Sequence, residues 1–341
     1  MSPARGPAAL ADALAALTVH VETADVERSA VPLPDYPGGP RPSSVVRLSG
    51  NGATGLGENV AFYQDEHERF AAFVGAWLRA NASQAPLHVG TALGAGGTPY
   101  ERAALEAALI DLGLRQAGLS LQDLTGVPAA ELRFVISMAA SAQPEAAIRG
   151  LRAAGYAGEL KLDVDPSWST ATLERLANDP SIAIFDFKAR GELVLAGRLH
   201  ALHAGALLED PPSGFEASGR ERWPLRISRD APVTDERAVA TARARGEAVN
   251  LKAPRMGGPL QLLRGLEQAL APSAHSHGAR VPAYFGGMFE VGVGRGQARQ
   301  LAALYCNAAP NDLALNHPDP ARSKASSPAV IRLDRPGFGD G

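Results

Sequence analysis

Cysteine is nearly absent from this sequence, since Cys306 is the only one among 341 residues. A single cysteine makes no intrachain disulfide and no cysteine-based zinc site, which favours a reducing compartment. Basic clusters are lacking too, and the net charge of −3 gives no indication of a nucleic-acid partner. We therefore expect a protein that acts on a small molecule.

A convincing signal peptide is also missing. Arg5 and the apolar stretch 8–17 resemble one, but Asp12 interrupts that stretch and no cleavage pattern follows. We expect a cytoplasmic protein with no membrane partner, and the sequence leaves open whether it forms a homo-oligomer. Hydrophobic residues make up 45% of the chain, which suits a globular protein with a sizeable core.

The dominant pattern is a series of short apolar runs that end on charged residues and recur roughly every 20 to 25 residues. The runs end at Lys161-Leu162-Asp163, Asp186, Glu209, Asp230 and Lys252. A strand, a loop and a helix together need about 20 to 30 residues, so this spacing predicts successive βα units. The carboxyl ends of the strands in a closed α/β barrel converge on one face, where active sites form.

Eight strand candidates follow residue 132, as a barrel requires. They are 133–138, 159–164, 182–188, 206–209, 225–228, 248–252, 281–286 and 312–315. Helices are expected between them, at a first turn marked by Pro144 and at 170–177, 193–202, 234–245, 260–270 and 295–305. The stretch 211–223 reads as irregular.

The region before the barrel predicts a smaller α+β domain. Its strand candidates are 17–22 and 44–49, and its helices are 65–81 and 99–117. The G-x-G-x-x-G pattern at 50–55 is better explained as a hairpin than as a dinucleotide site, because Asn51-Gly52 lies between two strand-like runs and no helix begins at Gly55.

Asp186, Glu209 and Asp230 would bring three carboxylates to one barrel mouth, and such a cluster is costly unless a cation neutralises it. Oxygen ligands favour Mg²⁺. Lys161 and Lys252, on opposite sides of that mouth, could then move a proton on carbon. The alternative is an ion-paired mouth that binds no metal.

These features resemble the enolase superfamily, in its muconate lactonizing enzyme-like branch. The similarity runs from Val45-Val46-Arg47-Leu48 to Pro336-Gly337-Phe338-Gly339 and covers nearly the whole chain. It implies an α/β fold in which an α+β N-terminal capping domain precedes a modified TIM barrel of the (β/α)7β type. We expect the capping domain at residues 1–125, the barrel at 126–320 and, at 321–341, a C-terminal segment that returns to the capping domain.

The resemblance also implies site residues. The metal positions match Asp186, Glu209 and Asp230, with Mg²⁺ as the cofactor, and the lysine of the sixth strand matches Lys252. Within the branch, Asn250-Leu251-Lys252 and the glycine-rich stretch 286–295 look most like o-succinylbenzoate synthases and N-acylamino acid racemases. We therefore expect Asn250, Gly287 and Glu290 to bind a small carboxylate substrate, with a structural carboxylate that supports Lys252 as the alternative role of Glu290.

Three departures from the family pattern bear on function. The usual Lys-x-Lys of the second strand is Lys161-Leu162-Asp163, so Asp163 stands where the catalytic lysine would be. The third strand ends in Asp186-Phe187-Lys188, which suggests that the ammonium has moved to Lys188 and pairs with Asp163. If Lys188 stays close to the metal position, its repulsion would weaken Mg²⁺ binding or replace the ion, and the site would only bind a carboxylate. If Asp163 holds it towards the substrate, Lys188 would act as a base opposite Lys252, with a pKa lowered by its neighbours, and we favour this second outcome because the three metal carboxylates are retained. The eighth strand carries Ala314-Leu315-Asn316, which disfavours dipeptide substrates.

The sequence thus predicts a lyase or isomerase that abstracts a proton next to a carboxylate with the help of Mg²⁺. Dehydration of the o-succinylbenzoate synthase kind and racemisation are the leading reactions. The alternatives are an acid-sugar dehydratase, because some of these carry a basic residue at the position of Lys188, and a barrel that only binds a carboxylate. His200 and His203 are one helical turn apart, and His275 and His277 precede the seventh strand; we expect both pairs to be surface residues. His317 follows the last strand and could reach the mouth.

Overall fold

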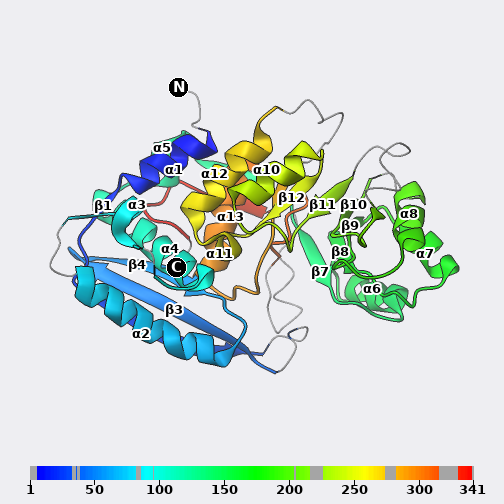
Figure 1. Ribbon diagram of the computed structural model, residues 1–341, viewed down its shortest axis with the longest axis horizontal. Coiled ribbons are helices and arrows are strands. Elements are labelled where there is room, and N and C mark those ends of the chain that lie inside the picture. Colours follow the sequence, from blue (N-terminus) through cyan, green and yellow to red (C-terminus); the bar gives the residue numbers. More distant parts are fainter. Residues whose placement is uncertain are drawn as a thin grey trace.

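The computed structural model describes residues 6–32, 36, 39–81, 86–94, 96–202, 205–215, 226–272, 282–314 and 329–339, except for the side chains at 195, 198 and 200–202. An N-terminal α+β part lies beside a curled parallel sheet with helices around it (Figure 1). This arrangement is the predicted fold class, a capping domain joined to an α/β barrel. None of the described helices is long and apolar enough to cross a bilayer.

The N-terminal part is built on an antiparallel sheet in the order β2-β3-β4. Its strands are β2 (Thr23–Val31), β3 (Arg41–Gly50) and β4 (Ala53–Asn59). Asn51 and Gly52 join β3 to β4 and have φ values of 48° and 71°, as a two-residue hairpin turn requires. The G-x-G-x-x-G pattern is therefore a hairpin, as predicted.

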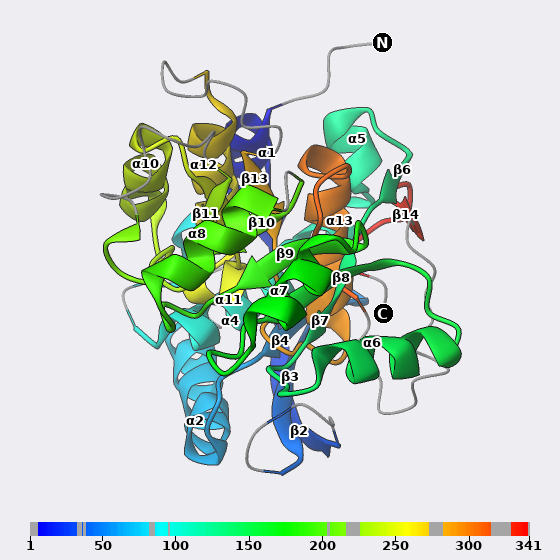
Figure 2. The ribbon, with the colours of Figure 1, turned by 90° about the vertical axis from the view of Figure 1, so that its right-hand side faces the viewer.

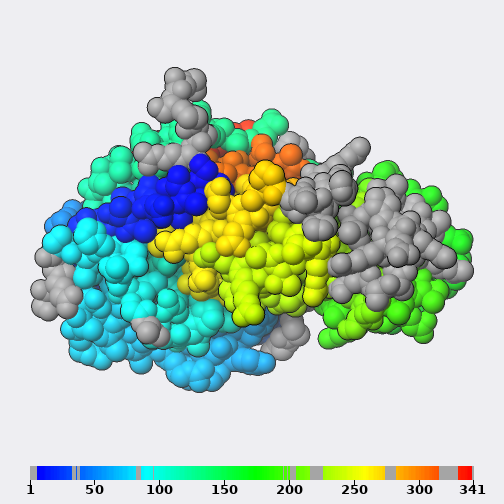
Figure 3. Space-filling view, turned by 45° about the horizontal axis from the view of Figure 1, so that its top comes forward, coloured from blue at the N-terminus to red at the C-terminus, as the bar shows by residue number. Residues whose placement is uncertain are grey.

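Helices and two short strands complete this part. They are α1 (Pro7–Ala15), β1 (Thr18–Val19), α2 (Gln64–Asn81), β5 (Leu87–His88), α3 (Val89–Ala92), α4 (Pro99–Ala117) and α5 (Leu121–Thr125). Helix α1 lies on α12 of the barrel (Pro259–Leu270), where Ala8 N donates to the Glu267 carboxylate at 3.0 Å (Figure 3).

The ends of α4 follow from local sequence. Thr98 and Glu101 form a capping box around Pro99 in the first turn, and Gly118 ends the helix in the left-handed conformation with a φ of 65°. The helix packs closely on β4 because Gly57 has no side chain, and a Cβ there would lie only 1.9 Å from the carbonyl oxygen of Ala104.

The larger part contains seven parallel strands that neighbour one another in chain order. They are β7 (Val135–Met138), β8 (Glu159–Asp163), β9 (Ile182–Asp186), β10 (Leu207–Glu209), β11 (Ile227–Arg229), β12 (Ala248–Leu251) and β13 (Ala283–Phe285). Asn311 and Asp312 connect the two edges of this sheet. Val135 N donates to the Asn311 carbonyl, and Asp312 N donates to the Phe285 carbonyl, each at 2.8 Å. These two residues take the place of the eighth strand.

The barrel helices are α6 (Pro144–Ala153), α7 (Thr170–Ala177), α8 (Leu193–Leu202), α10 (Glu236–Ala244), α11 (Ala253–Met256), α12 and α13 (Val293–Tyr305). Helices α6, α7 and α8 cover the outside of β8 and β9 (Figure 2). Their apolar side chains share one buried cluster with these strands, which includes Ile148, Leu160 and Leu173. Cys306 follows α13 and is buried, and this burial raises the pKa of its thiol to about 12, so that it stays protonated.

The C-terminal segment contacts both parts of the molecule. Strand β14 (Ala329–Arg332) pairs antiparallel with β6 (Ala129–Leu132), which directly precedes the barrel strands. A few residues further on, Phe338 N donates to the Asp111 carboxylate of α4 at 2.7 Å. The last described residues therefore tie the capping helix α4 to the barrel.

The element predictions were wrong in three places. No strand was assigned to 23–31, because β2 is largely exposed and its polar residues hide the period of a strand. The strand expected at 17–22 is only β1. The eighth strand is reduced to bridges at Asn311 and Asp312 within the described residues, and the irregular stretch expected at 211–223 lies outside them from residue 216 on.

A buried carboxyl between α4 and α12 gives a prediction on stability. Glu106 is buried, and Leu260 N donates to it at 2.8 Å. Burial raises the pKa of Glu106 from 4.5 to about 7. The folded state therefore holds this proton more tightly than the unfolded state does, and the stability of wild type should rise as pH falls from about 7 towards 4.5.

Glu106→Gln should remove most of this pH dependence, because glutamine carries no charge and its oxygen can still accept from Leu260 N. Above about pH 7 the variant should be more stable than wild type by up to about 3 kcal/mol. Urea unfolding at about pH 5 and about pH 8 measures the effect. The same difference between variant and wild type at both pH values would contradict it.

Candidate active site

The parallel register places the charged strand ends at one barrel mouth. Asp163 lies opposite Asp186, and Asp186 lies opposite Glu209, on the adjoining strands β8, β9 and β10. Asp230 and Lys252 directly follow β11 and β12. The structure therefore brings together the residues that the spacing singled out, as expected for strands of one barrel.

Lys161 lies at the centre of this mouth. Its Nζ is 2.5 Å from Glu209 Oε1, 3.1 Å from Asp186 Oδ2 and 3.4 Å from Asp312 Oδ2, and its side chain is 3% exposed. Burial opposes the charge, but Glu209 and Asp186 outweigh it and raise the pKa of Lys161 well above its ordinary value. Lys161 is therefore a fixed cation among three carboxylates and is poorly suited to be a base.

Glu209 is held from its other side as well. Its Oε2 accepts hydrogen bonds from the Tyr284 hydroxyl and, at 3.2 Å, from Asn250 Nδ2. Ser228 shares a hydrogen bond of 2.9 Å with the same hydroxyl. Asn250, predicted to bind substrate, is fully buried and uses its amide to orient Glu209.

Asp230 carries a second group of ion pairs. Lys252 Nζ donates to its Oδ2 at 2.8 Å, and Arg255 Nη1 donates to its Oδ1 at 2.6 Å. The backbone around Asp230 is fixed by Asp210, which accepts from Asp230 N at 3.1 Å and from Ala231 N at 2.8 Å. Glu209 thus points into the barrel, and Asp210 holds the backbone at the end of β11 through hydrogen bonds.

Lys188 pairs with two aspartates, Asp163 and Asp186. Its Nζ is 3.0 Å from Asp163 Oδ1 and 2.9 Å from Asp186 Oδ2, and its side chain is 49% exposed. The predicted contact between Asp163 and Lys188 is therefore present. Burial alone would lower the pKa of Lys188, but Asp186 and Asp163 raise it. The expected lowering of the Lys188 pKa is thus wrong, because both neighbours are anions. Its role as a base stays a prediction.

The Asp163–Lys188 contact can be tested with Asp163→Asn, Lys188→Met and the double variant. We expect a coupling free energy of roughly 0.5–1 kcal/mol from urea unfolding, because the half-exposed ammonium is screened by water. Asp165→Asn combined with Lys188→Met is the control. Asp165 is bonded to Ser167 N, so that combination should be additive. Additive effects for Asp163 and Lys188 would show that the two residues do not interact.

The glycines after β13 make room for side chains. A Cβ on Gly286 would lie 2.5 Å from Lys252 Cε, and one on Gly287 would lie 2.2 Å from Arg295 Nη1. Glu290 is buried, accepts from Met288 N and lies 3.2 Å from Arg295 rather than against Lys252. The glycine-rich stretch therefore packs around Lys252 and Arg295, and a role of Gly287 and Glu290 in substrate binding stays a prediction.

The predicted metal ligands are Asp186, Glu209 and Asp230. Each of their carboxylate oxygens accepts from a protein donor, namely the Lys188 amide and ammonium, Lys161, Asn250, Tyr284, Lys252 or Arg255. Mg²⁺ demands near-octahedral oxygen ligands, and these oxygens are already engaged. Within the described part of the chain, no three His, Cys, Asp or Glu side chains are arranged to hold a metal ion. As arranged, the site does not fit Mg²⁺.

Backbone strain is concentrated at the same mouth. Five non-glycine residues in the described chain have a positive φ, and all except Asn51 of the hairpin follow barrel strands: Lys188 (49°), Ala189 (57°), Asp210 (40°) and Phe289 (65°). Left-handed conformations cost such residues about 1–2 kcal/mol each, and strain of this kind clusters at functional sites. This observation favours a functional mouth over a merely ion-paired one.

The capping domain reaches the mouth through a buried arginine and two aromatic rings. Arg41 is fully buried and donates to the Met288 carbonyl at 3.3 Å. Tyr36 and Phe62 meet the ring of Phe289 edge-on, with centroids 5.5 and 6.5 Å apart. Tyr36, Arg41 and Phe62 of the capping domain therefore adjoin the loop that follows β13.

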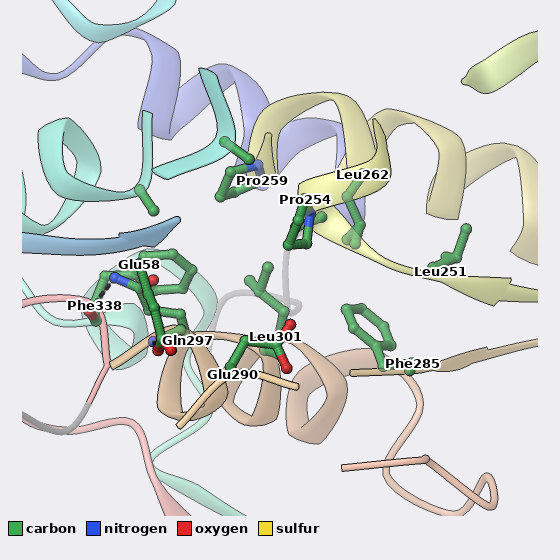
Figure 4. Close-up of a pocket in the computed structure, with 16 residues that line it drawn as sticks. Glu58, Leu251, Pro254, Pro259, Leu262, Phe285, Glu290, Gln297, Leu301 and Phe338 are labelled. Atoms are coloured by element: carbon green, nitrogen blue, oxygen red, sulfur yellow. Dashed lines mark hydrogen bonds between the residues drawn. The ribbon is translucent and has the colours of Figure 1, made fainter. Parts of the chain in front are cut away.

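A separate cavity lies between α4 and the barrel helices α11, α12 and α13. Pro254, Pro259 and Leu262 lie on one side of it, and Leu301 and Glu290 lie on the other (Figure 4). Its lining is mostly apolar. The second carboxylate in it, Glu58, accepts from Val291 N, Gly292 N and Gly294 N. We regard the barrel mouth as the candidate site because it brings lysines and carboxylates together at a strained backbone, whereas this cavity is mostly apolar.

Three residues of the mouth had not been predicted as functional. Asp312 contacts Lys161, Arg255 pairs with Asp230, and Tyr284 donates to Glu209. A charged residue at the start of the predicted eighth strand could have signalled Asp312. No local pattern signals the other two.

Some predicted features lie outside the described residues. They are His203, His275, His277, His317, the Leu315-Asn316 pair and the side chain of His200.

The fold is similar to those of solved structures described as members of the enolase superfamily. Similar solved structures include a probable mandelate racemase from Alicyclobacillus acidocaldarius, with 21% identity, 94% of each chain covered and a TM-score of 0.71. A dipeptide epimerase from Enterococcus faecalis V583 has 17% identity over 94% of this chain and 98% of its own, with a TM-score of 0.71. Muconate lactonizing enzyme from Pseudomonas putida has 19% identity over 84% of this chain and 83% of its own, with a TM-score of 0.60.

At these identities the likeness shows the fold alone. The chain belongs to the family described as Domain of unknown function (DUF8230), whose N-terminal domain matches residues 12–124 and whose C-terminal domain matches residues 129–318. No curated protein matches the sequence.

Proposed function

We propose that this protein binds a small carboxylate at the barrel mouth and transfers the proton on the carbon next to that carboxylate, in a reaction of the racemase or epimerase type. The observation that carries the proposal is the pair of lysines at one mouth, Lys188 after β9 and Lys252 after β12, in a backbone strained at four loop positions. The names of the similar folds, a probable racemase and an epimerase, support the same reaction class.

The mouth supplies the groups that this reaction needs. Removing a proton next to a carboxylate creates an enediolate, and preorganised positive charge lowers the barrier to its formation. Lys161 and Lys188 are held as cations by their aspartate and glutamate partners. Lys252 would carry the proton, and Arg255 would keep Asp230 paired during the transfer.

Mg²⁺, which the family resemblance implies, would provide positive charge at the enediolate oxygens. Since the carboxylates as arranged do not fit the ion, no step of this proposal uses it. The proposal assigns that charge to the ammonium groups of the chain.

Elimination of water is the second candidate reaction, as in o-succinylbenzoate synthases and acid-sugar dehydratases. One observation favours it: Lys188 is half exposed at the mouth and is held as a cation, so it can donate a proton to a leaving hydroxyl. A substrate with a hydroxyl on its β-carbon would undergo this reaction.

The test is proton exchange in D₂O. Wild type is incubated with a panel of small carboxylates, with and without a β-hydroxyl, and followed by proton NMR. Loss of the α-proton signal with the skeleton intact supports proton transfer, and a new alkene signal supports elimination. Thermal stabilisation by a carboxylate without either change would instead support a barrel that only binds its ligand. Arg175→Gln, which changes an exposed ion pair with Glu145, is the control and should behave as wild type.

A further inference from the structure

The ammonium of Lys161 contacts two of the three predicted metal ligands, Asp186 and Glu209. Its oxygen neighbours come from three different strand ends, Glu209 of β10, Asp186 of β9 and Asp312 beyond β13, at 2.5 to 3.4 Å. Convergent carboxylates of this kind are the ligands of a hard cation. Here the position is filled by a side chain that the chain itself carries on β8.

The other basic side chains of the mouth neutralise the remaining carboxylates, which weakens their attraction for a metal ion. Lys188 faces Asp163 and Asp186, while Lys252 and Arg255 share Asp230. Four basic side chains thus face five carboxylates. A divalent ion beside them would be repelled by Lys161 about as strongly as one carboxylate at the same distance attracts it, and Lys188 would offset a second carboxylate.

Tyr284 and Asn250 fix the orientation of the Glu209 carboxylate. Both donate to Glu209 Oε2 from neighbouring strands, so Glu209 Oε1 is turned towards Lys161. Both residues are fully buried. A rotation of Glu209 towards an incoming ion would leave these buried donors without a partner, which is costly.

We propose that Lys161 is an internal replacement for a divalent cation, so that this protein holds and polarises its carboxylate ligand without a metal ion. The proposal deepens the proposed function by naming the source of positive charge, and it rests on that function for the ligand. Binding of a metal can be measured without any ligand. The two proposals can therefore fail separately.

The experiment is a titration of the full-length protein with Mn²⁺, an oxygen-seeking stand-in for Mg²⁺, in which electron paramagnetic resonance measures the free ion. Wild type should show no site up to about 1 mM, a concentration that fills most carboxylate sites of sensor proteins. Lys161→Gln should gain one site at least about tenfold tighter, because Glu209, Asp186 and Asp312 lose their shared cation. Arg175→Gln removes the same charge at the surface and should gain no site.

Two results would overturn the proposal. One equivalent of Mn²⁺ bound by wild type below about 1 mM would show that Lys161 does not exclude the ion, and this measurement needs no variant. A folded Lys161→Gln protein that gains no site would show that the ammonium is not what fills the position. Lys161→Arg restores the positive charge and should again show no site, which separates the charge from a general loosening of the mouth.

Discussion

Replacement of Lys252 by methionine is expected to slow α-proton exchange in the substrate by about 10²–10⁴-fold, the usual contribution of a general acid–base group. Lys252 directly follows β12, is 6% exposed and lies 2.8 Å from Asp230. Gly286 and Gly287 follow the neighbouring strand β13. Methionine keeps most of the length of the side chain and removes the proton carrier. NMR exchange in D₂O measures the effect on the carboxylate identified by the panel.

The fold should survive this change. Asp230 keeps its ion pair with Arg255 at 2.6 Å, and Gly286 leaves room for the new side chain where the lysine stem now lies. Thermal unfolding of Lys252→Met within a few degrees of wild type would show that the loss of exchange is chemical. A variant that exchanges at nearly the wild-type rate would remove Lys252 from the reaction.

Lys252→Arg distinguishes charge from proton transfer. A guanidinium keeps a cation beside Asp230 but does not release its proton in proteins. We expect this variant to retain carboxylate binding, seen as thermal stabilisation, while exchange stays as slow as in Lys252→Met. Exchange restored by arginine would mean that Lys252 acts only through its positive charge.

Gly57→Ala is expected to cost about 3 kcal/mol or more in folding free energy. A Cβ at this position would lie 1.9 Å from the backbone oxygen of Ala104 and 3.0 Å from Ala108 N. These are backbone atoms of α4, so no side chain can rotate away and the whole helix must move off β4. The cost is therefore larger than that of a crowded side chain.

The control for this prediction is Gly150→Ala in α6, where nothing lies within 4 Å of the added carbon. Alanine is a better helix former than glycine, so this variant should be more stable by roughly 0.5–1 kcal/mol. Urea unfolding measures both variants. If Gly57→Ala were as stable as wild type, the close contact between α4 and β4 would not exist.

Much of the fold followed from local patterns. Helix α4 has the predicted bounds, because Thr98-Pro99 and Gly118 mark its two ends in the sequence itself. Apolar runs that end on a charged residue predicted the barrel strands. Their regular spacing predicted that the strands are parallel and neighbour one another in chain order. Strand β2 was missed since an exposed edge strand buries too few side chains to show a period.

The sequence by itself determined that Lys161, Asp186, Glu209, Asp230 and Lys252 lie at one barrel mouth, because strand ends in successive βα units must converge. Only the tertiary structure decided whether those charges are free or paired. Asp312 reaches Lys161 because the residues that close the barrel, Asn311 and Asp312, lie between β13 and β7. Arg255 reaches Asp230 from the short helix α11 that follows β12. Whether a carboxylate can bind a metal ion depends on whether such donors already occupy its oxygens. These donors come from distant strands, so no local sequence pattern predicts them.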